Sequence, residues 1–265
     1  MGSEDMSVVV GVCPNASLFF REEREGLARM IEDCGYNVQR VNDSWPRDRY
    51  IFYDGRYLTK RDAGTLGEGG YFQFAPDFIL VSDLLLGGVP SRSLAEREVS
   101  SYFPSKHVYG IHCGECRSSS GDKAQPIGHI DLTCLVIPSR RLLIFDSVLH
   151  RLGAFENIRN YFFGIGEREN YSVEFYESKE SFKLYPLNCL VLPNNNDGEL
   201  VFANRCDSGF LGLLSRYDVE FVTVPVHCTP MESGGSIRCC TNIKELSKPI
   251  NELIFPEKVI NPYWF

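Results

Sequence analysis

The sequence predicts an α/β fold made of repeated strand–strand–helix–strand units within one domain that covers residues 1–265. Two observations lead to this prediction. Segments rich in β-branched residues alternate along the chain with amphipathic stretches of helical spacing. The same order of elements also occurs twice in succession, and no Gly-, Ser- or Pro-rich linker separates the copies. Repeated units bury their open faces by stacking, which favours one closed domain.

The strands are predicted from β-branched content and alternation. They are Ser7–Cys13, Phe78–Asp83, His129–Ile137, Arg141–Phe145, Tyr171–Glu177, Asn188–Pro193, Gly198–Ala203, Val219–Val226 and Ser236–Ile243. Helices are predicted where apolar residues recur at a spacing near 3.6, often with capping residues at the ends. They are Arg21–Gly35, Ser91–Phe103, Leu152–Phe163 and Asp207–Asp218.

The order of these elements reveals the repeat. Residues His129–Glu177 are predicted as strand, turn, strand, helix and strand, and residues Asn188–Val226 repeat that order. The preceding region, Tyr50–Ile111, fits a third unit that carries a longer insertion. A series of similar units indicates a repeat architecture.

The composition limits the class of protein. The chain has 265 residues, of which 43% are hydrophobic and 12% aromatic, as in a globular protein with a sizeable core. Its formal charge is −8 and its basic residues form no cluster, so we expect neither nucleic acid nor an anionic membrane as a partner. No apolar stretch approaches the ~20 residues that span a bilayer. The N-terminal segment, Met1–Pro14, lacks the pattern of a signal peptide, which predicts a cytoplasmic protein.

The ten cysteines do not form the pattern of a secreted disulfide framework, since several lie beside apolar runs. The segment "HCGEC" differs, because it places His112 beside a Cys113–Cys116 pair. A zinc site usually needs a second pair of ligands, which His227 and Cys228 would have to supply in space. A plain surface loop is the favoured interpretation, and no metal is predicted.

Two polar residues at the head of a predicted strand suggest a site. In "GHID", the strand period places His129 and Asp131 on one face, with Ile130 on the other. A solvated strand face would show the same pattern. In "SWPRDRY", Trp45 and Asp48 offer an aromatic face and a carboxylate, which together suit a flat cation. The alternative is a turn whose Trp packs in the core and whose Asp pairs with Arg47 or Arg49.

Two further segments combine reactive residues with glycines. In "LGEGGYF", Glu68 precedes two glycines that permit close backbone approach, although an ordinary turn has the same pattern. In "ESGGSIRCCTN", strand alternation places Cys239 and Cys240 on opposite faces, so that one thiol can face a site. A cysteine nucleophile needs a base for proton transfer, and His129 is a candidate. The alternative is a pair of core cysteines.

Taken together and in this order, these segments resemble the pentein, or guanidine-modifying, superfamily. "WPRD" resembles its aromatic-x-R/E-D segment, "EGGY" its E-G-G-D, "GHID" its H-x-D and "GGSIRCC" its G-G-x-x-x-C. The resemblance spans residues 45–240. It implies a five-bladed ββαβ propeller, a guanidino compound as the small-molecule substrate, and chemistry that needs no cofactor.

The resemblance also implies a role for each matching residue. Cys239 would be the nucleophile, His129 the general acid and base, and Glu68 the residue that orients His129. Asp48 and Asp131 would bind guanidinium nitrogens, while Trp45 would pack against the guanidinium plane. "PSRSLAE" resembles the segment whose arginine holds a substrate carboxylate, which makes Arg92 a candidate for that contact.

Departures from the family pattern leave the substrate open. Tyr71 stands where the family has the aspartate of E-G-G-D, and Gly234 stands where arginine deiminases have an arginine. Asp131 is present, whereas the hydrolases of methylated arginine typically lack it. The expected activity is hydrolysis of a guanidino group through a covalent thiouronium. An amidinotransferase, a non-catalytic binding protein of the same fold and a redox or metal protein are the alternatives, and a homo-oligomer is left open.

Overall fold

The structure is a computed structural model. It describes residues 6–12, 16–86, 90–113, 115–117, 124–126, 128–147, 155–177, 185–194, 198–205, 207–226 and 236–254. The helices are α1 (Leu18–Asp33), α2 (Lys60–Ala63), α3 (Arg92–Tyr102), α4 (Phe155–Glu169) and α6 (Ser208–Arg216). The 3-10 turns include η2 (Pro46–Asp48), η4 (Gly69–Tyr71) and η5 (Ile130–Leu132).

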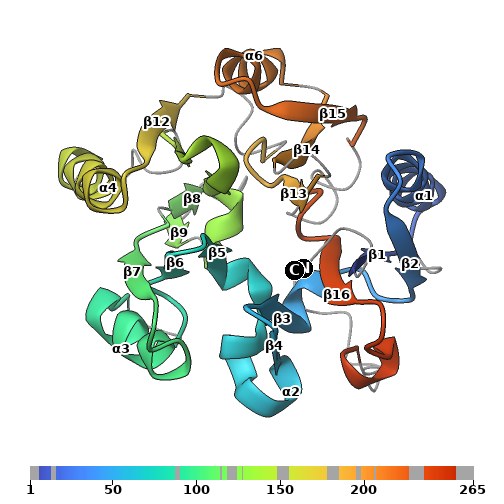
Figure 1. Ribbon diagram of the computed structural model, residues 1–265, viewed down its shortest axis with the longest axis horizontal. Coiled ribbons are helices and arrows are strands. Elements are labelled where there is room, and N and C mark those ends of the chain that lie inside the picture. Colours follow the sequence, from blue (N-terminus) through green and yellow to red (C-terminus); the bar gives the residue numbers. More distant parts are fainter. Residues whose placement is uncertain are drawn as a thin grey trace.

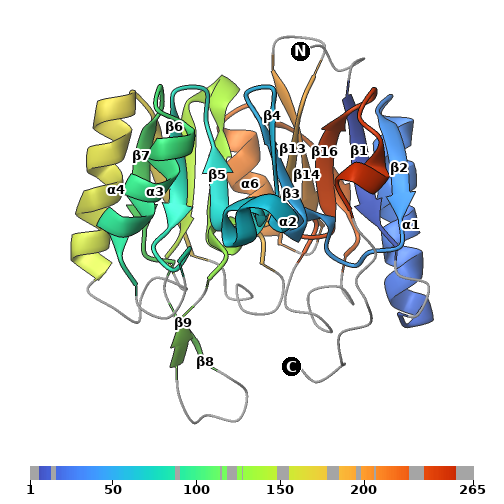
Figure 2. The same cartoon turned by 90° about the horizontal axis from the view of Figure 1, so that it is seen from below.

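The strands are short and arranged in small sheets. They are β1 (Met6–Gly11), β2 (Asn37–Val41), β3 (Tyr50–Tyr53), β4 (Arg56–Thr59), β5 (Phe72–Phe74), β6 (Phe78–Ser82), β7 (His107–Ile111), β8 (Glu115–Arg117), β9 (Ala124–Pro126), β10 (Cys134–Ile137), β11 (Leu142–Asp146), β12 (Ser172–Tyr176), β13 (Leu190–Pro193), β14 (Glu199–Asn204), β15 (Glu220–Val224) and β16 (Thr241–Glu245). The hairpin β8–β9 projects from one end of the molecule (Figure 2).

The sheets surround a common centre, and the helices lie on the outside of the molecule (Figure 1). In the part of the chain that the structure describes, the sheets around this centre are β16-β1-β2, β3-β4, β5-β6-β7, β10-β11-β12 and β13-β14-β15. In each three-stranded sheet the central strand pairs antiparallel with one neighbour and parallel with the other. The parallel pair is joined by a helix, as parallel strands require.

This pattern confirms the repeated ββαβ order and corrects one boundary. The predicted third unit, Tyr50–Ile111, is two units rather than one unit with an insertion. Its first part holds only the hairpin β3–β4 and the short helix α2, and its second part, Phe72–Ile111, is a complete ββαβ unit. The strands β3, β4 and β5, of three or four residues, were not predicted from the sequence, and neither were the five-residue strands β2 and β7.

The strand predictions at the two reactive segments are wrong in one respect. Strand β10 begins at Cys134 and β16 at Thr241, several residues after their predicted starts. His129 and Asp131 therefore lie before and within the 3-10 turn η5, and Cys239 lies in a turn, so strand alternation does not place these side chains. A single helical turn of three residues leaves no periodic signal in the sequence.

Apolar side chains pack between the sheets and against the helices. One cluster joins strands β6, β7, β10 and β11 to helix α4 and includes Phe78, Phe145 and Phe162. A second joins helix α1 to strands of the β16-β1-β2 and β13-β14-β15 sheets and includes Leu27 and Phe202. None of the described helices has both the length and the apolarity that a membrane crossing requires.

Candidate active site

The candidate site is built where the chain enters each inner strand. Trp45 precedes the turn η2 and strand β3, Glu68 precedes η4 and β5, and His129 precedes η5 and β10. Cys239 lies in the turn before β16, and Asn188 lies just before β13. Each unit thus contributes one short non-strand segment to the same region. All the motif residues except Arg92 come from such segments.

Glycines allow three of these segments to approach one another closely. A Cβ atom on Gly70 would lie 2.5 Å from His129 Nδ1, and a Cβ on Gly69 would lie 2.6 Å from Arg47 Nε. Any side chain at these positions would displace the imidazole or the guanidinium, because such distances are far below van der Waals contact. The glycines of "EGGY" therefore serve the close approach of the η2, η4 and η5 segments.

His129 lies between two carboxylates. Its Nδ1 is 4.0 Å from Asp48 Oδ1, and its Nε2 is 3.9 Å from Glu68 Oε2. The ring of Tyr71 packs edge-on against the imidazole, with the centroids 4.9 Å apart. The side chain of His129 is 26% exposed, so that solvent or a small molecule reaches it. Glu68, to which the resemblance assigns the orientation of His129, thus lies next to the imidazole without a hydrogen bond to it.

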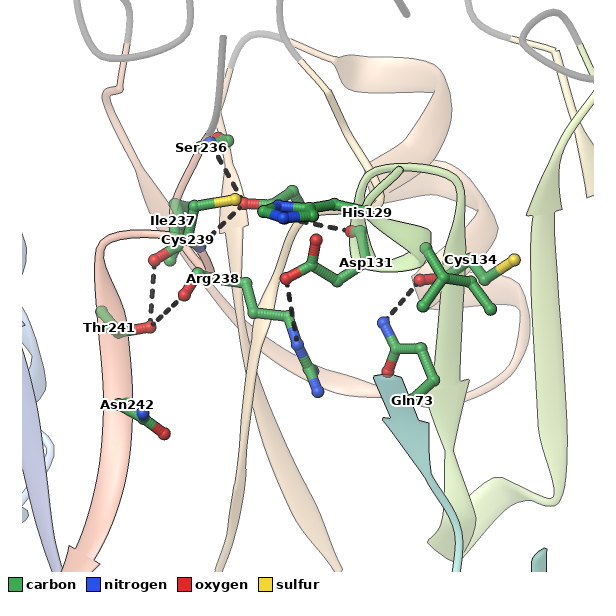
Figure 3. Close-up of polar contacts among 12 residues, drawn as sticks. Gln73, His129, Asp131, Cys134, Ser236, Ile237, Arg238, Cys239, Thr241 and Asn242 are labelled. Atoms are coloured by element: carbon green, nitrogen blue, oxygen red, sulfur yellow. Dashed lines mark hydrogen bonds and ion pairs between the residues drawn. The ribbon is translucent and has the colours of Figure 1, made fainter. Parts of the chain in front are cut away.

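Asp131 is fully buried and paired with a basic residue (Figure 3). Its Oδ2 is 3.7 Å from Arg238 Nε, a distance too long for a hydrogen bond. Among the described residues, neither carboxylate oxygen of Asp131 has a hydrogen-bond partner, and Oδ1 of Asp48 has none either. Arg47 is also buried, and its charge favours the ionised forms of both aspartates. The guanidinium groups of the buried Arg47 and the partly buried Arg238 therefore offset the carboxylates of the buried Asp131 and the partly buried Asp48.

Asn188 connects three parts of the site. Its Oδ1 accepts hydrogen bonds from the backbone N–H groups of Ser236 and Cys239, each at 3.1 Å. Its Nδ2 donates to the carbonyl oxygen of Asp131 at 3.0 Å. A second buried asparagine, Asn242, donates to the carbonyl oxygen of Pro46, at the start of η2, at 2.9 Å. These two side-chain amides thus fix the relative positions of turns that belong to different units.

Cys239 and its neighbour Cys240 face different parts of the core, as predicted. Cys239 belongs to the cluster around β10 and β11, and Cys240 to the cluster around β1 and α1. In Figure 3 the Cys239 thiol points to the side on which His129 lies. Burial raises the pKa of this thiol well above its usual range, and the Asp131 and Asp48 carboxylates raise it further. The free site therefore favours a neutral thiol.

Burial also alters the aspartates. It raises the pKa of Asp48 from 3.8 to about 6, with Asp131 and Glu68 adding to the shift and His129 opposing it. Burial raises the pKa of Asp131 too, against the opposing effects of His129 and Arg238. A cation bound beside these groups would reverse both shifts, since it would stabilise the carboxylates and the thiolate alike.

Trp45 packs against both core clusters. The guanidinium carbon of the buried Arg24 lies 5.0 Å from the centroid of its ring, so one region of the aromatic surface already contacts a cation of the protein. The alternative pairing of Asp48 with Arg49 is not found, because Arg49 Nε instead contacts Asp43 Oδ2 at 2.5 Å.

Arg92 lies at the start of α3 rather than in a turn before an inner strand. Its guanidinium carbon is 4.5 Å from the centroid of Tyr161, a residue of the outer helix α4. The structure thus brings together Asp48, Glu68, His129, Asp131 and Cys239. It places the Trp45 side chain against the core clusters and Arg92 at an outer α3–α4 contact.

The "HCGEC" segment contains no described metal cluster. His112 Nδ1 contacts Asp83 Oδ2 at 3.0 Å, and the buried thiol of Cys113 contacts Ser82 Oγ at 3.4 Å. In the described part of the chain, no group of three His, Cys, Asp or Glu side chains could hold a metal ion. The side chain of Cys116 and the segment with His227, Cys228 and Gly234 lie outside the described residues.

Several residues of the site were not predicted from the sequence, namely Arg47, Asn188, Arg238 and Asn242. Arg47 appeared only as an alternative partner of Asp48. The signal that could have identified Asn188 is its position, because it stands at the head of an inner strand, as the motif residues stand at the heads of theirs. Arg238 directly precedes the candidate nucleophile, but sequence alone does not show that it reaches Asp131.

No protein-family profile and no curated protein sequence matches this chain. Solved structures do match. The dimethylarginine dimethylaminohydrolase of Pseudomonas aeruginosa in complex with citrulline is 10% identical, with a TM-score of 0.58 over 90% of this chain and 98% of that chain. The N-terminal domain of ArgZ, a cyanobacterial arginine dihydrolase, bound to substrate, is 12% identical, with a TM-score of 0.61 over 90% of this chain and 98% of that chain.

A third similar structure is SxtG, an amidinotransferase from Microseira wollei in the saxitoxin biosynthetic pathway. It is 10% identical, with a TM-score of 0.63 over 91% of this chain and 95% of that chain. These similarities show that the chain shares the fold of these three proteins. At such low identity they leave the chemistry to be argued from the site itself.

Proposed function

We propose that this protein is a cysteine-dependent hydrolase of a guanidino group in arginine or an arginine derivative. Its product would be a ureido compound, and ammonia or an amine would leave. We further propose that the sheets around the centre are the blades of a five-bladed ββαβ propeller that forms one catalytic domain. The site residues would be Cys239, His129, Glu68, Asp48, Asp131 and Trp45.

One observation supports this function above others. Three buried carboxylate oxygens, on Asp48 and Asp131, have no hydrogen-bond donor among the described residues. Both carboxylates are close enough to the Cys239 thiol for their charges to raise its pKa. A buried oxygen without a donor is costly, so that the free site is poised for a ligand that supplies donors. A guanidinium is planar, always charged and rich in N–H groups, and it matches carboxylates in pairs.

The first chemical step would form a carbon–sulfur bond. Binding of the cation offsets the charges of Asp48 and Asp131 and favours the thiolate of Cys239, whose proton passes to His129. The sulfur attacks the central guanidinium carbon to give a tetrahedral adduct. His129 donates a proton to the departing nitrogen, the carbon–nitrogen bond breaks, and an S-alkylthiouronium remains on Cys239.

The second step would restore the enzyme. His129, now neutral, removes a proton from water, and the resulting hydroxide adds to the thiouronium carbon. The carbon–sulfur bond then breaks, the ureido product leaves and the sulfur departs as thiolate. Glu68, 3.9 Å from His129 Nε2, would stabilise the imidazolium in both steps. No redox change occurs, and the proton balance closes on His129 and solvent.

The test is a turnover assay with a matched pair of variants. The protein is incubated with arginine, methylated arginines, agmatine and other guanidino compounds, and ureido product is measured. We expect Cys239→Ser to lose turnover by about 10³-fold or more and Cys240→Ser to retain it. In the wild type, mass spectrometry of acid-quenched samples should detect the thiouronium adduct on Cys239. Turnover that survives Cys239→Ser would exclude the mechanism.

An amidinotransferase is the second candidate, since SxtG shares the fold. The two activities differ in which nucleophile attacks the thiouronium, water or an amine. Adding a series of primary amines to the assay distinguishes them, because a transferase would form a new guanidino product at the expense of the ureido product. If neither product forms with any guanidino compound, the binding-protein alternative is favoured.

A further inference from the structure

Lys60 lies beside the candidate site, at the junction of strand β4 and helix α2. Its Nζ is 2.8 Å from Glu68 Oε1, while the other oxygen of the same carboxylate faces His129 Nε2 at 3.9 Å. Glu68 is mostly buried, with a side chain that is 13% exposed, whereas the Lys60 side chain is 47% exposed. A single carboxylate thus connects a surface ammonium group to the imidazole of the site.

The backbone of Lys60 is held in place from two directions. Its N–H donates to the carbonyl oxygen of Arg49, at 2.8 Å, and Arg49 directly follows Asp48. A Cβ atom on Gly67, the residue before Glu68, would lie 2.2 Å from Lys60 N, so that these two segments are in close contact. The hydroxyl of Thr59 also accepts a hydrogen bond from Asp62 N and fixes the turn in which Lys60 lies. The Lys60–Glu68 pair is therefore set by the fold.

We propose that Lys60 is a positioning residue that holds Glu68 beside His129 and partly neutralises its charge. The proposal rests on the role given to His129 under Proposed function. Each carboxylate around His129 then has a basic neighbour: Arg47 for Asp48, Arg238 for Asp131 and Lys60 for Glu68. Lys60 is the solvent-exposed member of these three bases.

The charge of Lys60 matters because His129 must be neutral to act as a base. Glu68 and Asp48 stabilise the imidazolium, and an unopposed Glu68 would stabilise it more. The other charged and polar groups of the site are Asp131, the phenol of Tyr71, the thiol of Cys239 and the guanidinium groups of Arg47 and Arg238. Removing Lys60 leaves these groups in place, so that its effect can be measured separately.

The experiment is a proton NMR titration of His129 in the ligand-free protein. The Cε1–H resonance is assigned among the five histidines by its loss in His129→Gln. We expect Lys60→Met to raise the pKa of His129 by about 0.3–0.6, because a cation near the carboxylate is removed. Lys60→Arg should stay within about 0.1 of the wild type, as should Arg61→Met, which removes the same charge one residue along.

A kinetic arm uses the same variants with a guanidino compound that the wild type turns over. We expect the acid limb of kcat/KM to move to higher pH in Lys60→Met by the shift seen in NMR, and Lys60→Arg to restore it. An unchanged His129 titration in Lys60→Met, or a shift equal to that of Arg61→Met, would overturn the proposal even if turnover is found. Absence of turnover in the wild type would instead count against the proposed function, while the NMR result would still decide the role of Lys60.

Discussion

At the scale of single residues, the geometry of the site depends on two glycines, because their lack of a Cβ atom leaves room for neighbouring side chains. Gly70 leaves space that His129 occupies, and Gly69 leaves space for Arg47. The sequence motifs pointed to Asp48, Glu68, His129, Asp131 and Cys239, because the chemistry and the order of these residues are visible in the sequence. Their geometry could not be predicted, since His129 and Asp131 were placed by strand alternation and instead belong to a 3-10 turn with very different exposure, 26% and 0%.

Gly70→Ala tests this packing. The new Cβ would lie 2.5 Å from His129 Nδ1, so that the imidazole must move. We expect kcat/KM to fall by about 10²-fold, with a loss of about 1–3 kcal/mol of stability. Gly128→Ala is the matched control, since its Cβ would meet its nearest neighbour, Tyr71 Oη, at an ordinary 3.4 Å. Equal activity of the two variants would show that this contact does not position His129.

At the scale of elements, the recurrent feature is a short turn that precedes the inner strand of each unit. The ββαβ order was predictable because the strands from β10 to β15 include runs rich in Leu, Ile, Val and Phe and alternate with the amphipathic helices α4 and α6. The turns could not be predicted, because three-residue helical segments such as η2 and η4 show no periodicity in the sequence. Their role also depends on contacts with residues of other units. Asn188 and Asn242 make those contacts through side-chain amides, whose partners are set only when the sheets have assembled.

Asn188→Ala tests the connection between turns. It leaves two buried backbone N–H groups, on Ser236 and Cys239, without their acceptor, which should cost about 2–5 kcal/mol of stability. We expect lower kcat per folded molecule and alkylation of Cys239 by iodoacetamide that requires higher pH, because Asn188 also lowers the pKa of the thiol. Asn204→Ala, which removes a buried hydrogen bond to the Val226 carbonyl oxygen, should cost stability but leave the alkylation profile unchanged. Identical alkylation profiles would contradict the role of Asn188.

At the scale of the whole molecule, the charged carboxylates of the site lower the stability of the folded protein at neutral pH. The sequence indicates the acidic balance of the chain, but not that Asp48 and the buried Asp131 interact electrostatically, which depends on how segments distant in the sequence pack together. Because folding raises the pKa of Asp48 from 3.8 to about 6, the folded state binds a proton more tightly than the unfolded state. That contribution to stability is complete below pH ~4 and is lost as the pH rises through about 6.

Asp48→Asn should therefore be more stable than the wild type at neutral pH, yet inactive. The side chain of Asn stays neutral, so we expect a gain of about 1–3 kcal/mol at pH 7.5 that vanishes near pH 4, measured by urea unfolding across this range. Exposed Asp54, which has a φ of 53° that Asn also adopts, supplies the control substitution Asp54→Asn. A stability gain that does not depend on pH would refute the electrostatic explanation.

The pairing of strand β1 has a consequence for how the protein folds. Strand β1 is hydrogen-bonded to β2 on one side and to β16 on the other, with Met6 opposite Glu245. Contacts between residues so distant along the chain form late, because the intervening loop must first lose its entropy. Cys239 stands in the turn that leads into β16. We therefore expect the turn that holds Cys239 to take its final position late in folding, after most of the chain between β1 and β16 has folded.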